Sequence, residues 1–119
     1  MFVRKLKDCK EIVAGDNCIL RELLGKKDNI VNYSLAKAIV KPGDITYKHK
    51  LKESSEVYYI LEGDGLMYID NETKEVGSGD TIYIPHNSVQ RIKNTGDKNL
   101  VFLCIVEPAW CPEDEKILE

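Results

Sequence analysis

The sequence predicts an all-β fold, and three observations carry that prediction. Short runs rich in Val, Ile, Tyr and Leu recur along the chain, and such residues favour strands. Turn residues, mainly Gly, Asn and Asp, separate these runs about every 8–12 residues, which is the spacing of a β-sandwich or barrel. No segment in the body of the chain has a sustained helical period. We therefore expect about eight strands in an all-β sandwich or barrel.

The first half of the chain divides into an arm and three strands. Residues 1–16 have no clean period and are predicted to form an N-terminal arm or an edge strand that ends at a Gly-Asp-Asn turn. Residues 18–24 and 30–40 are short and apolar, and the Pro42-Gly43 pair stops the second of them, so both are expected to be strands. The next strand is expected in residues 44–51.

The stretch from 43 to 63, GDITYKHKLKESSEVYYILEG, combines one histidine and several acids with strand patterning. In residues 44–51, Ile45, Tyr47, His49 and Leu51 alternate with polar residues, which places them on one face, predicted to look into the core. Residues 55–61 form the next strand, with Glu56 on the same face as Tyr58. A buried carboxylate needs a partner, because an isolated buried charge is very costly.

The second half of the chain reads as further strands divided by tight turns. The Gly63-Asp64-Gly65 segment is expected to form a hairpin into GLMYID. Further turns precede the runs TIYIP, VQRIKN and LVFLCIVEP, and Cys104 in the last of these is expected to be a buried thiol. Residues 111–119 are predicted to be a C-terminal tail that opens with one helical turn at Pro112.

Composition limits the classes of partner and the location. The chain has 119 residues, which is the size of a single domain, and a formal net charge of −3. That charge argues against nucleic acid and anionic membranes as partners, since both attract basic surfaces. We find no apolar run long enough for a membrane helix and no secretory signal, so a cytoplasmic location is expected. In a reducing compartment the four cysteines are expected to be free thiols.

The spacing of several residues resembles the two sequence motifs of the cupin superfamily. The first motif places Gly, His, His, Glu and Gly at positions that here hold Gly43, His49, Leu51, Glu56 and Gly63. The second motif places Gly, Pro, Gly, His and Asn at positions that here hold, in order, residues 79, 85, 87, 90 and 94; Gly, Pro and Asn match, but residue 87 is Asn and residue 90 is Gln. The resemblance implies a double-stranded β-helix, or jelly-roll barrel, with residues 43–94 as its central part.

The resemblance also implies a metal site from which two of the four usual ligands are missing. Metal-binding cupins usually present three His and one Glu, whereas this chain offers His49, Leu51, Glu56 and Gln90 at those positions. The predicted ligands are therefore His49, Glu56 and Gln90. One divalent metal (Mn, Zn, Fe or Ni) is implied, and the missing imidazoles leave open whether it is weakly bound or absent.

Three hypotheses for function follow from the residues and the resemblance. The first is a sugar or sugar-phosphate isomerase or epimerase, similar to mannose-6-phosphate isomerases, with His49, Glu56 and Tyr58 as catalytic residues. The second is a non-catalytic module that binds or senses a small polar metabolite. The third, a metal-dependent dioxygenase, is less favoured because only one imidazole is in register. His86 is expected to lie in a solvated loop, and open sheet edges favour a homodimer.

Overall fold

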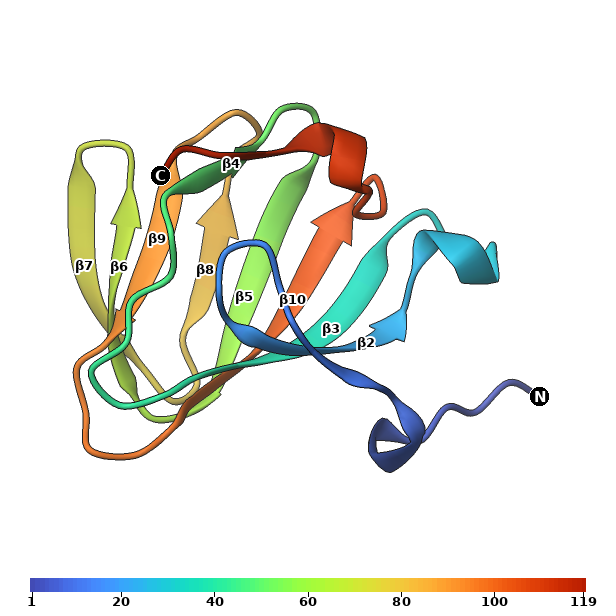
Figure 1. Ribbon diagram of the computed structural model, residues 1–119, viewed down its shortest axis with the longest axis horizontal. Helices are drawn as coiled ribbons and strands as arrows, with labels where there is room; N and C mark the ends of the chain where they lie inside the picture. Colours follow the sequence, from blue (N-terminus) through green and yellow to red (C-terminus); the bar gives the residue numbers. More distant parts are fainter.

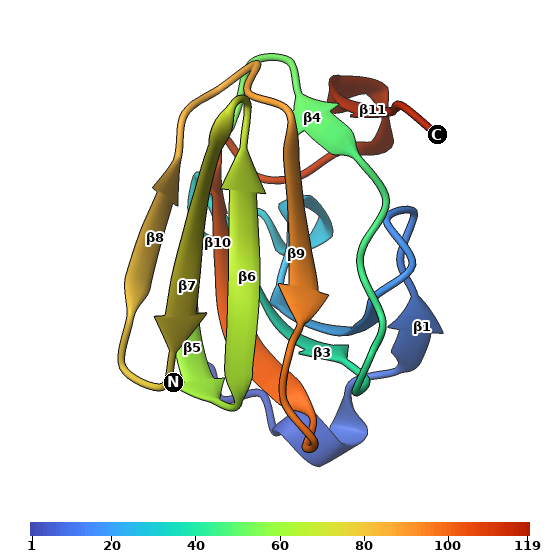
Figure 2. The ribbon, with the colours of Figure 1, turned by 90° about the vertical axis from the view of Figure 1, so that its left-hand side faces the viewer.

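Two antiparallel sheets face each other across a common interior in the computed structural model, which describes all residues 1–119 (Figures 1 and 2). The six-stranded sheet has the order β1 (Glu11–Val13), β2 (Ile19–Leu24), β3 (Ser34–Val40), β10 (Leu100–Glu107), β5 (Ser55–Glu62) and β8 (Thr81–Ile84). The five-stranded sheet has the order β11 (Glu115–Ile117), β4 (His49–Leu51), β9 (Gln90–Asn94), β6 (Asp64–Ile69) and β7 (Glu72–Gly77). The predicted all-β jelly-roll fold is confirmed.

The only helical segments are three single turns of 3₁₀ helix: η1 (Leu6–Asp8), η2 (Lys26–Asp28) and η3 (Pro112–Asp114). Pro112 occupies the first position of η3, where its missing N–H is no loss. None of these turns has the length or apolar content to span a bilayer.

Regular alternation of side chains builds the inner faces of the long strands. In β3 every second residue from Ser34 to Val40 is buried. In β5 the inward residues are Glu56, Tyr58 and Ile60. The period of two follows from the pleat of the strand, so these faces could be read from the sequence. The strand expected in residues 30–40 therefore exists, although its regular part starts only at Ser34.

The core between the sheets continues into a cavity. Twelve buried hydrophobic residues form one cluster, with Phe102 and Ile60 among its largest fully buried side chains. The rings of Tyr58 and Phe102 lie 4.4 Å apart between centroids. Cys104, expected to be a buried core thiol, belongs to this cluster. Cys18, Tyr58, Phe102 and Cys104 also line the cavity, so its walls are part of the packed core.

The segment before His49 departs from the expected regular strand. Strand β4 covers only His49–Leu51, and Tyr47 is 43% exposed instead of facing inward. The buried residues are Thr46 and His49, which are three positions apart. The backbone of Thr46 bonds to Ile92, and the N–H of Tyr47 bonds to the carbonyl of Asp16. Since these contacts interrupt the pleat, the alternation fails at Tyr47 while His49 still points inward.

The expected hairpin at Gly63 is wrong, because the chain crosses from one sheet to the other at this point. Strand β5 belongs to the six-stranded sheet, whereas β6 pairs with β7 and β9 in the five-stranded sheet. Gly63 has a φ of 93°, and a Cβ on it would lie 2.6 Å from the carbonyl oxygen of Asn99. The crossing therefore needs glycine for both conformation and space.

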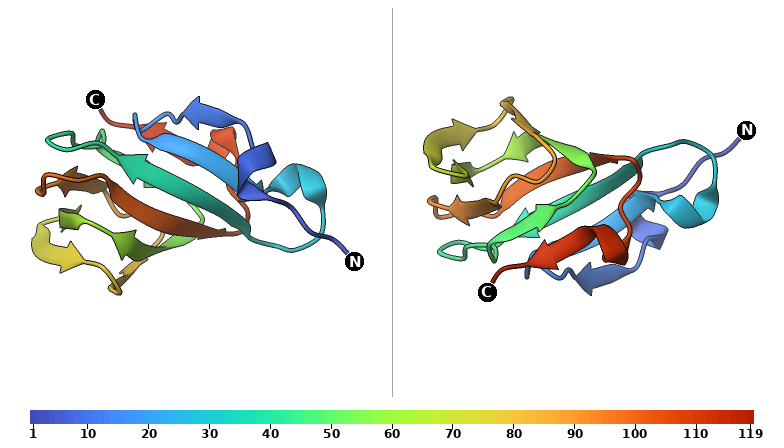
Figure 3. Two further views of the ribbon diagram at one scale, coloured as in Figure 1. Left: turned by 90° about the horizontal axis from the view of Figure 1, so that it is seen from below. Right: turned by 90° about the horizontal axis from the view of Figure 1, so that it is seen from above.

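The β1–β2 turn and the C-terminal segment meet at the end of the barrel that holds β4, whereas the N and C termini themselves lie on opposite sides of the molecule (Figure 3). The N-terminal arm contributes β1, which forms an edge of the six-stranded sheet. The C-terminal segment, expected as a tail, contributes β11, which pairs with β4 from Glu115 opposite Leu51 to Ile117 opposite His49. The segment that carries His49 is therefore held between β9 and β11.

Candidate functional site

A cavity of about 310 Å³ opens between the sheets where β4, β11 and the β1–β2 turn meet. Seventeen residues line it, and twelve of these are hydrophobic. The polar lining consists mainly of four ionisable side chains: Asp16, His49, Glu56 and Glu115. No Lys or Arg contributes to the lining. The cavity is therefore an apolar chamber in which a few acidic groups surround one imidazole.

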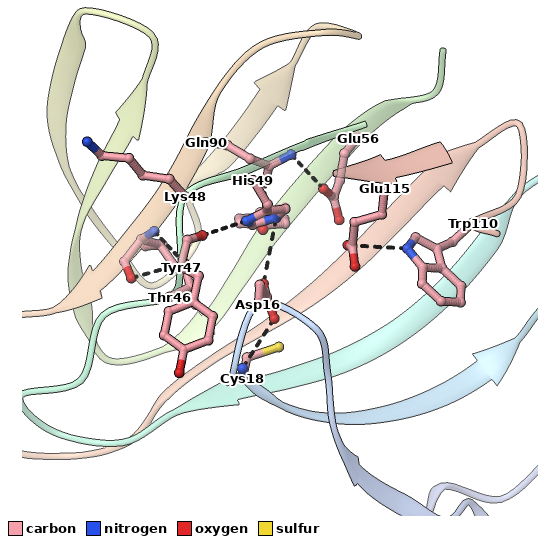
Figure 4. A network of polar contacts seen from close by, with 12 residues as sticks. Asp16, Cys18, Thr46, Tyr47, Lys48, His49, Glu56, Gln90, Trp110 and Glu115 are labelled. Atoms are coloured by element: carbon pink, nitrogen blue, oxygen red, sulfur yellow. Dashed lines mark hydrogen bonds and ion pairs between the residues drawn. The ribbon is translucent and has the colours of Figure 1, made fainter. Parts of the chain in front are cut away.

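His49 is buried, and one of its two ring nitrogens is committed to the backbone. Its side chain is 3% exposed, and Nδ1 lies 2.7 Å from the carbonyl oxygen of Tyr47 (Figure 4). A carbonyl oxygen only accepts hydrogen bonds, so Nδ1 must carry the proton. In the neutral imidazole, Nε2 is then a free base. This irregular stretch before β4 therefore fixes the tautomer that leaves Nε2 available.

Asp16 brings a carboxylate to the free nitrogen of His49 from a distant part of the chain. Its Oδ2 lies 3.7 Å from Nε2, which is too long for a hydrogen bond but close enough for electrostatic attraction. Its Oδ1 accepts the N–H of Cys18 at 3.2 Å, a local bond typical of Asp in turns. Asp16 is 7% exposed. It lies on the loop between β1 and β2 and points toward the imidazole ring (Figure 4).

Glu56, Gln90 and Tyr58 form a buried relay across the two sheets. The Gln90 amide N–H₂ donates to Glu56 Oε1 at 3.1 Å, and the Tyr58 hydroxyl donates to Gln90 Oε1 at 2.9 Å. Glu56 and Tyr58 are inward neighbours on β5, while Gln90 begins β9 directly opposite His49. The glutamine thus satisfies two buried polar groups at once, as buried polar groups require.

Burial shifts the protonation of the groups around the cavity. Burial raises the pKa of Glu56 to about 8; its bond from Gln90 lowers it, and the negative charges of Asp16 and Glu115 raise it further. Burial also raises the pKa values of Tyr58 and Cys104 well above their usual ranges. At neutral pH Glu56 therefore holds its proton, and Tyr58 and Cys104 stay neutral.

Glu115 closes the cavity from the C-terminal side. Its Oε2 accepts the indole N–H of Trp110 at 3.3 Å, and a Cβ built on Gly15 would lie 2.8 Å from its Oε1. The carboxyl group therefore rests against the β1–β2 turn, where a larger residue than Gly15 would displace it. Partial burial raises the pKa of Glu115, while the neighbouring His49 lowers it.

The structure brings together four of the residues expected at the site. His49, Glu56, Tyr58 and Gln90 meet at one end of the barrel, with Phe102 and Cys104 behind them as expected. Two other expectations concern residues outside the cavity: Tyr47 was expected to face inward but is exposed, and His86 is exposed in the turn after β8, as expected. All four cysteines are free thiols.

Sequence reasoning missed Asp16 and Glu115. Asp16 lay in a Gly-Asp-Asn triplet that reads as a turn, and Glu115 lay in a run of acids that reads as the start of a helix. Neither belongs to a motif, and each is far from His49 in the sequence. Only the packing of the β1–β2 turn against the C-terminal segment places both carboxyls beside the imidazole.

Fold and site together define a double-stranded β-helix with a small ionisable cavity inside one end. The chain belongs to the cupin domain family Cupin_2, which matches residues 36–106. The match covers more than half of the chain, including β4, β5 and β9, which carry His49, Glu56 and Gln90. Asp16 and Glu115 lie outside the matched region.

Comparison with known proteins gives similar sequences and similar folds. An uncharacterized protein of Methanocaldococcus jannaschii is 49% identical over 113 residues, which is 92% of this chain and 89% of that protein. A glucose-6-phosphate isomerase of Pyrococcus abyssi is 29% identical in a match that covers 87% of this chain and 68% of that protein. The nucleoside dehydratase Pac13 of Streptomyces superposes with a TM-score of 0.82 at 18% identity, covering 100% of this chain and 92% of that structure, which shows the shared fold.

The side chains at this site provide an incomplete set of ligands for the divalent metal that the family implies. No three His, Cys, Asp or Glu side chains are grouped so that they would hold a metal ion. Leu51, buried and lining the cavity, has no donor atom, and the carbonyl oxygen of Gln90 already accepts the Tyr58 hydroxyl. The three predicted ligands do not fit a metal without rearrangement of the relay, so we derive no chemical step through one.

Restoring one missing imidazole is expected to increase metal binding. In Leu51→His the new side chain would start from the same inner face of β4 as His49, where family members carry a second histidine. The measurement is metal content per chain by elemental analysis after equilibration with Mn²⁺ or Zn²⁺ and gel filtration, with Leu51→Asn as a control of similar polarity. Equal metal content in wild type and Leu51→His would contradict a depleted donor set.

Proposed function

We propose that the cavity binds a small polar metabolite and exchanges protons with it, as an isomerase or epimerase of sugar-like molecules does. The observation that carries this proposal is the pairing of one free base with one protonated carboxyl on the wall of a single cavity. His49 presents Nε2, and Glu56 holds a proton at neutral pH. Two titratable groups whose environments separate their protonation states are suited to act as base and acid.

In this proposal His49 Nε2 removes a proton from a carbon or hydroxyl of the substrate. The Tyr47 carbonyl keeps Nδ1 protonated throughout, and the carboxylate of Asp16, 3.7 Å from Nε2, stabilises the imidazolium that forms. Glu56 returns a proton to the opposite end of the reacting group. Since its Oε1 is held by Gln90, its other oxygen is the one that can face the substrate.

Tyr58 has a positioning role in this mechanism rather than a catalytic one. Its hydroxyl donates to Gln90, and the Gln90 amide in turn fixes the Glu56 carboxyl. Tyr58 therefore acts on the substrate through two intervening side chains. The apolar walls, which include Phe102 and Val106, exclude water and strengthen the electrostatic interactions inside.

The sequence suggested a substrate that is a sugar or a sugar phosphate. The charges in the cavity favour the first of these. Sugar phosphates carry negative charge, and anion binding normally uses Lys, Arg or helix N-termini. None of these lines the cavity, and the carboxylates of Asp16 and Glu115 would repel a phosphate. We therefore propose a substrate without phosphate or carboxylate. The relative described as a glucose-6-phosphate isomerase supports the class of reaction, not that substrate.

Deuterium exchange tests the proposed chemistry before the substrate is known. Purified protein is incubated in D₂O with a panel of unphosphorylated aldoses, ketoses, amino sugars and their phosphates, and proton NMR follows exchange at carbon. We expect exchange with at least one unphosphorylated compound and a loss of about 100-fold or more in His49→Gln, because a positioned base contributes about that much. Glu75→Gln, on the exposed part of β7, is the matched surface control. Exchange that survives unchanged in His49→Gln would contradict the role of His49.

The second candidate is a non-catalytic module that binds or senses a metabolite. Twelve hydrophobic lining residues favour it, because an apolar chamber can retain a ligand without chemistry. A ligand that raises the melting temperature but shows no exchange would favour this alternative. The expected homodimer and cytoplasmic location stay predictions.

A further inference from the structure

The ionisable groups around the cavity carry more acid than base. The complete set of titratable side chains in its lining is Asp16, Cys18, His49, Glu56, Tyr58, Cys104 and Glu115. Three of these are carboxyls, and His49 is the only one that can become positive. The carboxyls outnumber the single imidazole, and no Lys or Arg of the lining offsets them. Carboxylates removed from water are costly without a positive partner or hydrogen-bond donor.

Three side chains, each nine-tenths buried or more, have an atom that no protein group satisfies with a hydrogen bond. Nε2 of His49 has only the 3.7 Å contact to Asp16 Oδ2, and that oxygen has no other partner. Glu56 uses Oε1 for Gln90, and its second oxygen accepts no hydrogen bond from the protein. These atoms border a cavity with room for a ligand. Because these side chains line the cavity, a bound ligand can supply the hydrogen-bond partners that the protein does not.

We propose that the cavity recognises a small organic cation, a protonated amine with a compact hydrocarbon or polyol body. This deepens the proposed function, because it takes the same cavity as the binding site and narrows the substrate class. The ammonium group offers N–H donors and positive charge, which suit Asp16 Oδ2. The second oxygen of Glu56 becomes a further acceptor when the nearby positive charge of the ammonium displaces its proton. An anionic ligand would instead add to the negative charge already present.

The rest of the lining suits the body of such a ligand. Leu51, Phe102 and Val106 offer apolar surface, and Trp110 adds an aromatic ring near the acidic Glu115. Faces of Trp, Tyr and Phe attract cations, with a contribution that grows when the pair is removed from water. A cavity of about 310 Å³ matches the lower end of the size range of small-molecule sites. A compact primary amine therefore meets both requirements, the charge and the space.

Isosteric probes isolate the contribution of the positive charge. We would measure melting temperature and titration calorimetry at pH 7.5 with cyclohexylamine, cyclohexanol and cyclohexanecarboxylate, and with glucosamine and glucose. We expect at least one amine to bind at least tenfold more tightly than its uncharged isostere and the carboxylate not to bind. Equal affinity of amines and alcohols, or preference for the carboxylate, would overturn the proposal.

Two variants test whether the cavity is the site that binds amines more tightly than alcohols. Asp16→Asn keeps a carbonyl oxygen for the Cys18 N–H, so its fold should persist, and it is expected to weaken the amine about tenfold while leaving the alcohol unchanged. Glu115→Gln serves the same purpose if Asp16→Asn does not fold. Asp80→Asn, on an exposed turn, is the surface control. Amine binding that is equally strong in both cavity variants would place the cation elsewhere and overturn the proposal.

A metal ion could supply the same positive charge, so one arm of the experiment separates the two sources. Each titration is run with EDTA and again with added Mn²⁺ or Zn²⁺. Amine binding that persists in EDTA supports the proposal, whereas binding that appears only with metal overturns it. The binding experiment can fail or succeed independently of the exchange experiment. Amine binding without deuterium exchange would refute only the proposed proton transfer. Deuterium exchange with uncharged sugars, but no tighter binding of amines than of alcohols, would refute only the proposal that the cavity prefers a cation.

Discussion

Replacing Gln90 by leucine is expected to lower the free energy of unfolding by about 2–6 kcal/mol. The substitution removes the acceptor of the Tyr58 hydroxyl and the donor to Glu56, both of which are buried. Each buried polar group left without a partner costs about 1–3 kcal/mol, and two groups are affected. Leucine is close to glutamine in size, so the loss reflects hydrogen bonds more than a cavity. Urea denaturation followed by the fluorescence of Trp110, the only tryptophan, gives the measurement.

A double-mutant cycle separates the relay from ordinary packing. Tyr58→Phe alone is expected to destabilise the protein, because the carbonyl of Gln90 loses its donor. In the Gln90→Leu background the same change should be neutral or stabilising, since it removes a hydroxyl that has lost its acceptor. Additive effects of the two substitutions would contradict a relay through Gln90. The positioning role of Tyr58 would then lose its structural basis.

Stability is expected to fall as the pH rises from about 4.5 to about 8, and Glu56 is the reason. Burial raises the pKa of Glu56 from 4.5 to about 8 in the folded protein. Between these values the folded state keeps the proton and the unfolded state does not, so raising the pH favours unfolding. The contribution of Glu56 is fully present below pH 4.5. It declines by about 1.4 kcal/mol per pH unit inside the window and levels off above pH 8.

Glu56→Gln provides the control for this pH dependence. An amide does not titrate, so the variant lacks the pH dependence that Glu56 contributes. The unfolding free energy of wild type minus that of the variant should therefore decrease steadily from about pH 4.5 to about pH 8. Glu75→Gln, exposed on β7, should follow the wild-type curve. The lowered pKa of Asp28, about 2 beside Arg4, affects stability only below pH 3.8. The raised pKa of Glu115 contributes inside the window, but it is present in both proteins and cancels in their difference. Parallel curves for wild type and Glu56→Gln would show that Glu56 titrates normally.

The inner faces of the regular strands and the positions of His49, Glu56 and Gln90 could be predicted from the sequence. In β3 and β5 buried and less buried side chains alternate, so the residues that share a face follow from the strand period, as Glu56, Tyr58 and Ile60 do. The motif spacing added the jelly-roll fold, because glycines and a proline at fixed intervals mark where the chain must turn. Tyr47 shows the limit of this reasoning: backbone bonds to Asp16 interrupt the pleat before β4, and the period no longer reports the face.

The sequence by itself determined which residues share a face wherever the backbone geometry repeats, because the period of a strand is a local property. The residues that surround the imidazole of His49 depend on how the barrel closes. This closure brought Asp16 from the first turn and Glu115 from the last strand to the same cavity. It also bonded Gln90 to Tyr58 and Glu56 instead of leaving its oxygen free. The physical reason is that proximity between distant segments arises from sheet pairing and packing, which no local pattern records.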